Sequence, residues 1–276
     1  MLVPHRNFNL INGVHSPDEV DQIQNWEIRD SDIFAVTYPK SDEYWRQHGY
    51  TYLEYPDHLN AQCVPWIKLI GSEKEFNATL SPRLRVTHLQ YKFMPLAVRQ
   101  KRGKVCGDVL VSYYHFHKYA AMLETPKDFN DFFEKFMEGK VFGNCWFEHI
   151  KTWYANRDNM NFLYIIYEEM IKDLRSVVER MCRFLGKDLT EEQMASVVEH
   201  STFRTMKQNP QANYKTVPDS LLDHSKGTFM RKGTIGDWKN HFTVAQSERF
   251  DSVFQEKMRD LPRSFTWDIN DINSAT

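Results

Sequence analysis

The chain has 276 residues, of which 41% are hydrophobic and 14% aromatic, so it can bury a sizeable core and general disorder is excluded. Its 35 Lys and Arg residues nearly balance 37 Asp and Glu residues, which argues against nucleic-acid binding through bulk positive charge. The sequence contains no apolar run near the roughly 18 residues of a membrane-spanning helix and no recognisable signal peptide. Four scattered cysteines form no C-x-x-C pair. We therefore expect a soluble, cytoplasmic protein with reduced thiols that binds neither membrane nor nucleic acid.

Three apolar, β-branched segments are typical of strands that are buried on both faces of a parallel sheet. They cover residues 33–38, which stop at Pro39, and residues 84–89 and 161–167. Ligands bind beyond the carboxyl ends of the strands in such sheets. Lys40, His88 and Tyr167 stand at or just after these ends, so they are the first candidates for a site.

Apolar residues spaced three and four apart predict helices over 128–139, 142–156, 168–185 and 244–261, and a further helix that opens at Thr190. Strands that alternate with helices predict an α/β fold, in which helices flank a central, mainly parallel sheet. The sequence contains no internal repeat and no long linker, which favours a single domain.

The segment 229–240, FMRKGTIGDWKN, is the strongest candidate for a binding loop. Two adjacent cations followed by a glycine suit a loop that wraps a phosphate dianion. An ordinary basic surface turn fits the same residue types equally well. Lys40 and Ser41, which follow the first strand, are a second candidate for binding phosphate. The chain has no G-x-x-x-x-G-K-[ST] motif, which disfavours a nucleotide kinase or triphosphatase.

Histidines need separate treatment, because a single histidine after a strand is more often structural than catalytic. His88 is therefore a candidate base that requires further support. His115 and His117 flank Phe116, but the sequence offers no carboxylate or third ligand at a helpful spacing. Packing is the favoured interpretation of this pair, and we predict no metal site.

The motifs together resemble those of the cytosolic sulfotransferases, which transfer a sulfuryl group from 3′-phosphoadenosine 5′-phosphosulfate (PAPS) to hydroxyl or amine acceptors. The resemblance rests on YPKS at 38–41 and RKGTIGDWKN at 231–240, with THL at 87–89, VSYYHF at 111–116, YEEM at 167–170 and FLG at 184–186 in the family's order. It is nearest to the amine and phenol branches. It implies a P-loop-like α/β domain over 27–268, preceded by a segment 1–26 and followed by a flexible tail 269–276.

The resemblance also implies roles for individual residues. His88 would be the general base, and Lys40 would stabilise charge on the bridging oxygen of the leaving phosphate. Ser41 would help hold the 5′-phosphosulfate, and Ser112 would bind the 3′-phosphate. The full set that it assigns to PAPS is Lys40, Ser41, Trp45, Lys104, Ser112, Tyr167, Ser201, Phe203, Phe229, Met230, Arg231, Lys232 and Gly233. The co-substrate is PAPS, no metal is required, and the acceptor is a small molecule, with aromatic compounds favoured.

A short motif near the C-terminus, made by Lys239, Thr243, Val244 and Glu248, matches the family's dimerisation motif and implies a homodimer. Thr243 also fits a plain helix N-cap with no partner, so both interpretations stand.

The chain departs from the family pattern in three places. Asp42 and Glu43 follow Ser41 where the family has Gly-Thr, which sets two carboxylates beside a phosphate. Residues 101–108 are too few for a strand and its Arg motif, so we predict that one strand is missing and that Lys104 stands in for the Arg. Residues 46–79 are shorter than the family requires. These junctions are more typical of lost or misjoined coding segments than of gradual divergence. The alternative function is therefore a catalytically impaired relative that acts as a binding or dimerising module.

Overall fold

The computed structural model describes residues 2–40, 77–78, 81, 83–96, 109–210 and 212–261. Strands β3 (Ile33–Val36) and β4 (Leu84–Thr87) pair in parallel, with Ile33 opposite Leu84 and Val36 opposite Thr87. Both strands lie within segments that the sequence predicted as strands, and their parallel pairing confirms the α/β prediction for this part of the sheet. The predicted loss of a strand falls on residues 101–108, which lie outside the described residues.

A buried ion pair lies immediately before the two strands. Asp32 precedes β3 and Arg83 precedes β4, and both side chains are fully buried. Arg83 Nε donates to Asp32 Oδ1 at 2.7 Å, and its other nitrogens donate to the Asn77 side chain and the Glu27 carbonyl. Because this pair joins equivalent points of the two strands, it stabilises the register in which they pair.

An N-terminal hairpin and a short helix complete the part of the core that the sequence analysis treated as a separate segment. Strands β1 (Leu2–His5) and β2 (Phe8–Ile11) pair antiparallel across a turn at Arg6 and Asn7, which both have positive φ. Phe8 is buried, and its ring lies 5.3 Å from that of Phe93. The hairpin therefore packs against the core.

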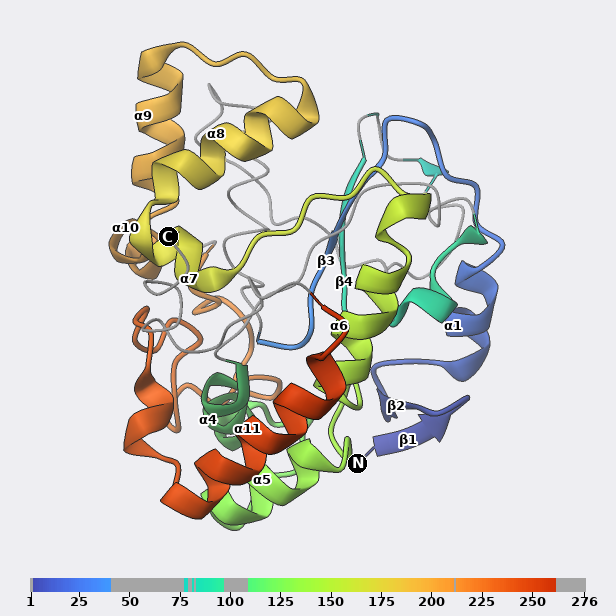
Figure 1. Cartoon of the computed structure of the whole chain (residues 1–276), viewed down its shortest axis with the longest axis vertical. Helices are drawn as coiled ribbons and strands as arrows, with labels where there is room; N and C mark the ends of the chain where they lie inside the picture. The colour runs from blue at the N-terminus through green and yellow to red at the C-terminus, as the bar shows by residue number, and fades with distance from the viewer. Residues whose placement is uncertain are drawn as a thin grey trace.

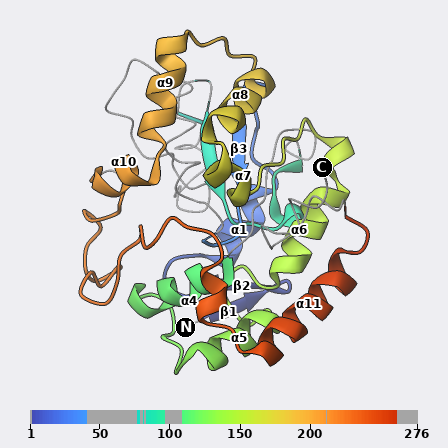
Figure 2. The same cartoon turned by 60° about the vertical axis from the view of Figure 1, so that its left-hand side comes forward.

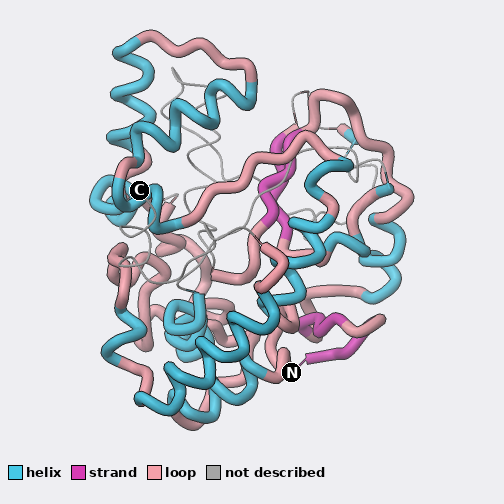
Figure 3. The backbone as a smooth tube through the Cα atoms, viewed as in Figure 1, coloured by secondary structure: helices cyan, strands magenta, loops and turns pink. Residues whose placement is uncertain are grey.

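Helices account for most of the remaining described structure, as the colours of Figure 3 show. The α-helices are α1 (Pro17–Ile23), α4 (Val109–Tyr119), α5 (Phe129–Met137), α6 (Trp146–Ala155), α7 (Tyr167–Lys172), α8 (Leu174–Leu185), α9 (Glu191–His200), α10 (Phe203–Gln208) and α11 (Val244–Met258). Short 3₁₀ helices are η2 (Tyr91–Phe93), η4 (Arg157–Asn159) and η5 (Asp237–Asn240). Among the described residues, no helix is long and apolar enough to span a bilayer.

Several helices gather at the two ends of the molecule, and α6 lies beside the parallel strands (Figure 1). Helices α4, α5 and α11 gather at one end of the molecule and α8 and α9 at the other, with β3 and β4 between them (Figure 1). The rotated view in Figure 2 gives the same separation. Helix α4 lies near the carboxyl end of β3, since the ring of Tyr113 is 6.0 Å from that of Tyr38. Helix α4 also lies close to the segment that contains η5.

Two predictions of secondary structure were wrong. The apolar segment 161–167 forms no strand: residues 161–166 are irregular, and Tyr167 begins α7. The carbonyl of Tyr164 accepts a hydrogen bond from Arg180 of α8 at 3.1 Å, so a side chain takes the place of a ladder partner. The predicted helix 168–185 is two helices, because Asp173 leaves the helical conformation and its carboxylate caps α8 by accepting from the Ser176 amide.

The other predicted helices form with small shifts. The stripe at 142–156 becomes helical only from Trp146, and 128–139 becomes α5 with Asp128 as its N-cap. Thr190 and Thr243 begin α9 and α11 with complete capping boxes, each made with a glutamine three residues later.

Candidate active site

His88 lies directly beyond β4, and a hydrogen bond to the end of β3 defines its tautomer. Its Nδ1 is 2.9 Å from both the carbonyl oxygen and the hydroxyl of Thr37. A carbonyl can only accept, so Nδ1 carries the proton and the basic lone pair belongs to Nε2. His88 is 3% exposed and packs edge-on against Phe142 at 5.9 Å. In the neutral imidazole, Nε2 is therefore the nitrogen that can accept a proton.

Lys40 lies beyond the end of β3 and reaches across to the other half of the chain. Its backbone adopts a φ of 64°, which is uncommon for a residue with a side chain and occurs often at functional sites. Its ammonium lies 3.5 Å from the centre of the Phe229 ring and 5.2 Å from that of Phe116 on α4. The structure thus brings Lys40 to the start of the predicted phosphate-binding loop.

Gly233 in that loop packs directly on the ring of Phe203, the first residue of α10. A Cβ atom at Gly233 would lie 2.3 Å from the Phe203 ring, and the backbone has a φ of 68°. Both facts require glycine at this position. The contact joins two residues of the set that the resemblance assigns to PAPS.

Arg231 and Lys232 are both engaged by Asp237, an interaction that the sequence analysis did not foresee. Arg231 Nη1 is 2.6 Å from Asp237 Oδ2, and Lys232 Nζ is 2.5 Å from Oδ1, which also accepts from Asn240. Burial raises the pKa of Asp237, but these hydrogen bonds outweigh it and hold that pKa well below its ordinary value. The two cations thus already bind an anion here, which is the capacity that a phosphate site needs.

The remaining residues of the predicted set are distributed around this centre. Phe229 and Met230 are buried, and the Phe229 ring lies 4.3 Å from that of Tyr214, a neighbour that the sequence analysis missed. Ser112 is on α4, the helix that also carries Phe116. Ser201 ends α9 next to Phe203, and its Oγ is buried with no hydrogen-bond partner in the part of the chain that the structure describes. Such an orphaned hydroxyl fits a polar atom of a bound ligand.

Several parts of the prediction cannot be located. Ser41, Trp45 and Lys104 lie outside the described residues, as do Asp42 and Glu43 and the shortened segment 101–108. Tyr167 is described, but it begins α7 rather than ending a strand, so the interpretation that first singled it out was wrong.

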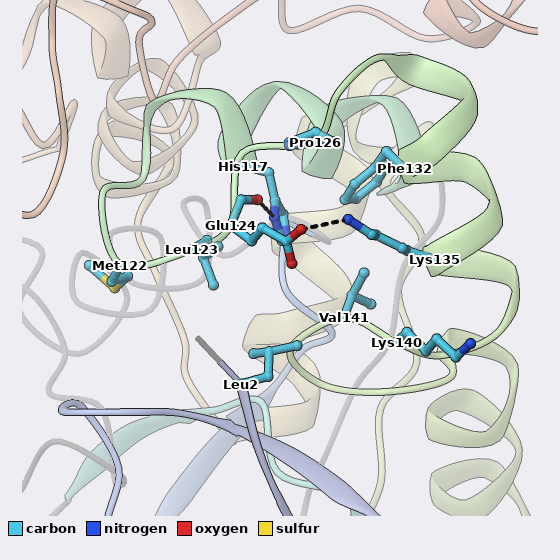
Figure 4. A pocket seen from close by; sticks show the side chains of 10 residues that line it. All are labelled: Leu2, His117, Met122, Leu123, Glu124, Pro126, Phe132, Lys135, Lys140 and Val141. Atoms are coloured by element: carbon cyan, nitrogen blue, oxygen red, sulfur yellow. Dashed lines mark hydrogen bonds and ion pairs between the residues drawn. The ribbon is translucent and has the colours of Figure 1, made fainter.

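A pocket elsewhere on the molecule contains none of the predicted site residues. It lies among α4, α5 and β1 and has a volume of about 340 Å³, part of which is open solvent (Figure 4). Glu124 organises it by an ion pair to Lys135 at 2.9 Å and by its carbonyl, which accepts from His117 Nδ1 at 2.9 Å. The convergence of His88, Lys40 and the 229–233 loop, not this pocket, is therefore our candidate active site.

Comparison with known proteins identifies the family. Residues 30–262 match the sulfotransferase domain. The chain belongs to the sulfotransferase family. Rabbit (Oryctolagus cuniculus) amine sulfotransferase is 39% identical to it over 267 residues, covering 91% of this chain and 89% of the relative. Sulfotransferase 2B1 of Mus musculus is 41% identical over 277 residues, covering 95% of this chain and 82% of the relative.

The fold of this sulfotransferase also matches solved structures. The crystal structure of mouse sulfotransferase SULT7A1 complexed with PAP aligns with a TM-score of 0.79 and 28% identity, covering 94% of this chain and 95% of that one. The prediction of a single α/β domain with the sulfotransferase fold is thereby confirmed, as is the family. The assignment of individual residues to catalysis or to PAPS stays a prediction.

Proposed function

We propose that this sulfotransferase transfers a sulfuryl group from PAPS to a hydroxyl or amine of a small acceptor. The observation that carries the proposal is the convergence of three distant segments: His88 beside Thr37, Lys40 against Phe229, and Gly233 on Phe203. The PAP complex of SULT7A1 supports the choice of nucleotide, since PAP is what PAPS leaves after transfer.

Each residue has one role in the proposed reaction. Nε2 of His88 accepts the proton of the acceptor hydroxyl or amine, whose oxygen or nitrogen forms the new bond to sulfur. The bond between that sulfur and the bridging oxygen of the 5′-phosphate breaks in line, and the electron pair stays on this oxygen. Lys40 stabilises the charge that develops there. Arg231 and Lys232 exchange Asp237 for the 3′-phosphate, and Phe203 stacks on the adenine.

The test separates binding from turnover. Purified wild-type chain is melted with and without 3′,5′-bisphosphoadenosine, and turnover is measured with PAPS and a phenol, an amine and a 3β-hydroxysteroid. The last two follow the names of relatives that are 39% and 37% identical. Ligand at 100 times its dissociation constant should stabilise the native state by about 2.7 kcal/mol.

His88→Asn should lower turnover by about 100- to 10,000-fold and leave the bisphosphate shift intact. Lys232→Met should reduce the shift itself. His200→Gln is the matched control, because His200 lies at the end of α9, where its Nδ1 is 2.8 Å from the Ser196 carbonyl of the same helix. A wild-type melt that bisphosphate does not shift would overturn the nucleotide site. A shift without turnover on any acceptor would instead support the catalytically impaired alternative.

We also propose that the chain forms a homodimer through Lys239, Thr243, Val244 and Glu248. Val244 is 75% exposed at the start of α11, which suits an apolar contact with a second copy. Thr243 caps the helix by accepting from the Gln246 amide at 3.2 Å, so the cap and the dimer motif are compatible. Val244→Glu should convert a dimer to a monomer in sedimentation velocity, because a carboxylate at this position favours the helix N-terminus but not an apolar contact. Leu96→Glu, at another exposed apolar residue, is the control. A wild type that sediments as a monomer would refute the motif's role.

A further inference from the structure

Two histidines and a carboxylate from distant parts of the chain converge beside the Arg231-Lys232 pair. His115 lies on α4, Asp237 begins η5, and His241 directly follows that helix. Their ligand atoms all lie within 4.8 Å of one another. The sequence analysis grouped His115 with His117, but residues two apart on a helix point about 200° away from each other. His115 meets Asp237 and His241, whereas His117 points into the pocket of Figure 4.

We propose that His115, Asp237 and His241 bind a first-row transition-metal ion such as Zn²⁺, at a site separate from the sulfuryl-transfer chemistry. Imidazole nitrogen and carboxylate oxygen are ligands that suit this class of ion. Three protein ligands leave a fourth tetrahedral position for water or another group.

The distances are close to those of a tetrahedral site. Bonds of about 2.0–2.2 Å to nitrogen and oxygen put neighbouring ligand atoms about 3.3–3.6 Å apart around a tetrahedral ion. Nε2 of His115 lies 3.5 Å from Nε2 of His241, which in turn lies 3.6 Å from Asp237 Oδ2. Two of the three ligand–ligand distances therefore need almost no change, and a small rotation of Asp237 can shorten the third.

Neighbouring side chains hold the ligands in place. Asn240 donates a hydrogen bond to Asp237 Oδ1 at 3.0 Å. The His241 ring is further positioned by Phe129, whose ring centre lies 5.4 Å away.

Arg231 and Lys232 weaken metal binding at this site. Both are positively charged, both already pair with Asp237, and both repel an incoming cation. A phosphate bound to these two side chains would neutralise them and release the carboxylate. Bisphosphate should therefore strengthen metal binding, and by reciprocity the metal should strengthen bisphosphate binding by the same factor. This coupling, unlike the site itself, rests on the proposed function.

The experiment uses Co²⁺, which occupies tetrahedral Zn²⁺ sites and absorbs visible light there. The full chain, cleared of metal with a chelator and dialysed, is titrated with Co²⁺ with and without 3′,5′-bisphosphoadenosine, and Zn²⁺ is then added as a competitor. We expect a tetrahedral absorption band that Zn²⁺ abolishes, and roughly tenfold tighter Co²⁺ binding with bisphosphate. The double variant His115→Gln/His241→Gln should weaken binding at least about 100-fold.

His241→Gln alone is the second variant, since His241 is 23% exposed and its replacement should not prevent folding. His5→Gln is the matched control: His5 also pairs with a carboxylate, Asp21 at 2.7 Å, outside this cluster. Absence of the band in both conditions, or a band that survives in the folded variants, would overturn the site. A Co²⁺ affinity that is the same with and without bisphosphate would overturn the coupling but not the site. A bisphosphate melt performed in chelator tests the phosphate site independently.

Discussion

Replacement of Gly233 by alanine tests the contact that joins the two halves of the proposed nucleotide site. The new Cβ would lie 2.3 Å from the Phe203 ring, well inside contact distance, at a backbone φ of 68°. Two costs follow. The left-handed backbone costs a residue with a side chain roughly 1–2 kcal/mol, and overpacking against the ring adds about 1–3 kcal/mol.

Gly186→Ala separates these two costs, because Gly186 has a φ of 64° but nothing within 4 Å of its Cβ position. It should therefore carry the backbone cost alone. At about 2–4 °C per kcal/mol for a chain of this size, Gly233→Ala should lower the melting temperature clearly more than Gly186→Ala does.

Bisphosphate binding provides the second measurement. The alanine displaces Phe203 from the position where it would stack on the adenine, and such stacking contributes about 1–3 kcal/mol. Calorimetric titration should therefore show binding weakened about tenfold in Gly233→Ala and unchanged in Gly186→Ala. Equal losses of stability in the two variants, together with equal affinities, would refute the close contact and the role that we derive from it.

Three further predictions concern stability. Asp32→Ala leaves the Arg83 charge buried, so the free energy of unfolding measured by urea denaturation should fall by about 3–5 kcal/mol. A loss below about 1 kcal/mol would contradict the buried pair. Burial, partly offset by the hydrogen bond to the Glu124 carbonyl, lowers the pKa of His117 from 6.5 to about 4. The unfolded chain then binds more protons than the folded chain between these two pH values. The free energy of unfolding should therefore fall by on the order of 3 kcal/mol as the pH drops from 6.5 to 4. In His117→Asn the melting temperature should depend less on pH in this range. The lowered pKa of Asp237 stabilises the folded chain above the ordinary value of 3.8, and this stabilisation is lost as the pH falls further. The melting temperature of Asp237→Asn should therefore fall less in acid than that of the wild type.

Local sequence patterns predicted much of the secondary structure. Apolar β-branched runs located β3 and β4, and Thr190 and Thr243, as residues suited to an N-cap, located two helix starts. The segment 161–166 carries an equally apolar pattern yet forms no strand. A strand depends on pairing with another backbone as well as on its own residues, and a local pattern does not report that pairing.

The site shows the same division between local and distant information. Arg231 and Lys232 could be found because they are adjacent, and Asp237 follows within the same motif. The approach of His115 to His241 joins residues 126 positions apart, and no spacing rule connects them. Such a pair becomes visible only when α4 and η5 have been folded against each other.

The backbone of Thr37 makes two hydrogen bonds with different consequences. Its N–H donates to the Thr87 carbonyl at 2.9 Å, which continues the pairing of the parallel strands, while its carbonyl accepts from His88. Slippage of one strand by a single residue would turn Thr37 to the opposite face and remove the imidazole's acceptor. A single-residue insertion or deletion within 33–37 should therefore abolish the proton abstraction that we propose for His88, even where the chain still folds. In this proposal the alignment of the two strands is itself part of the acid–base machinery.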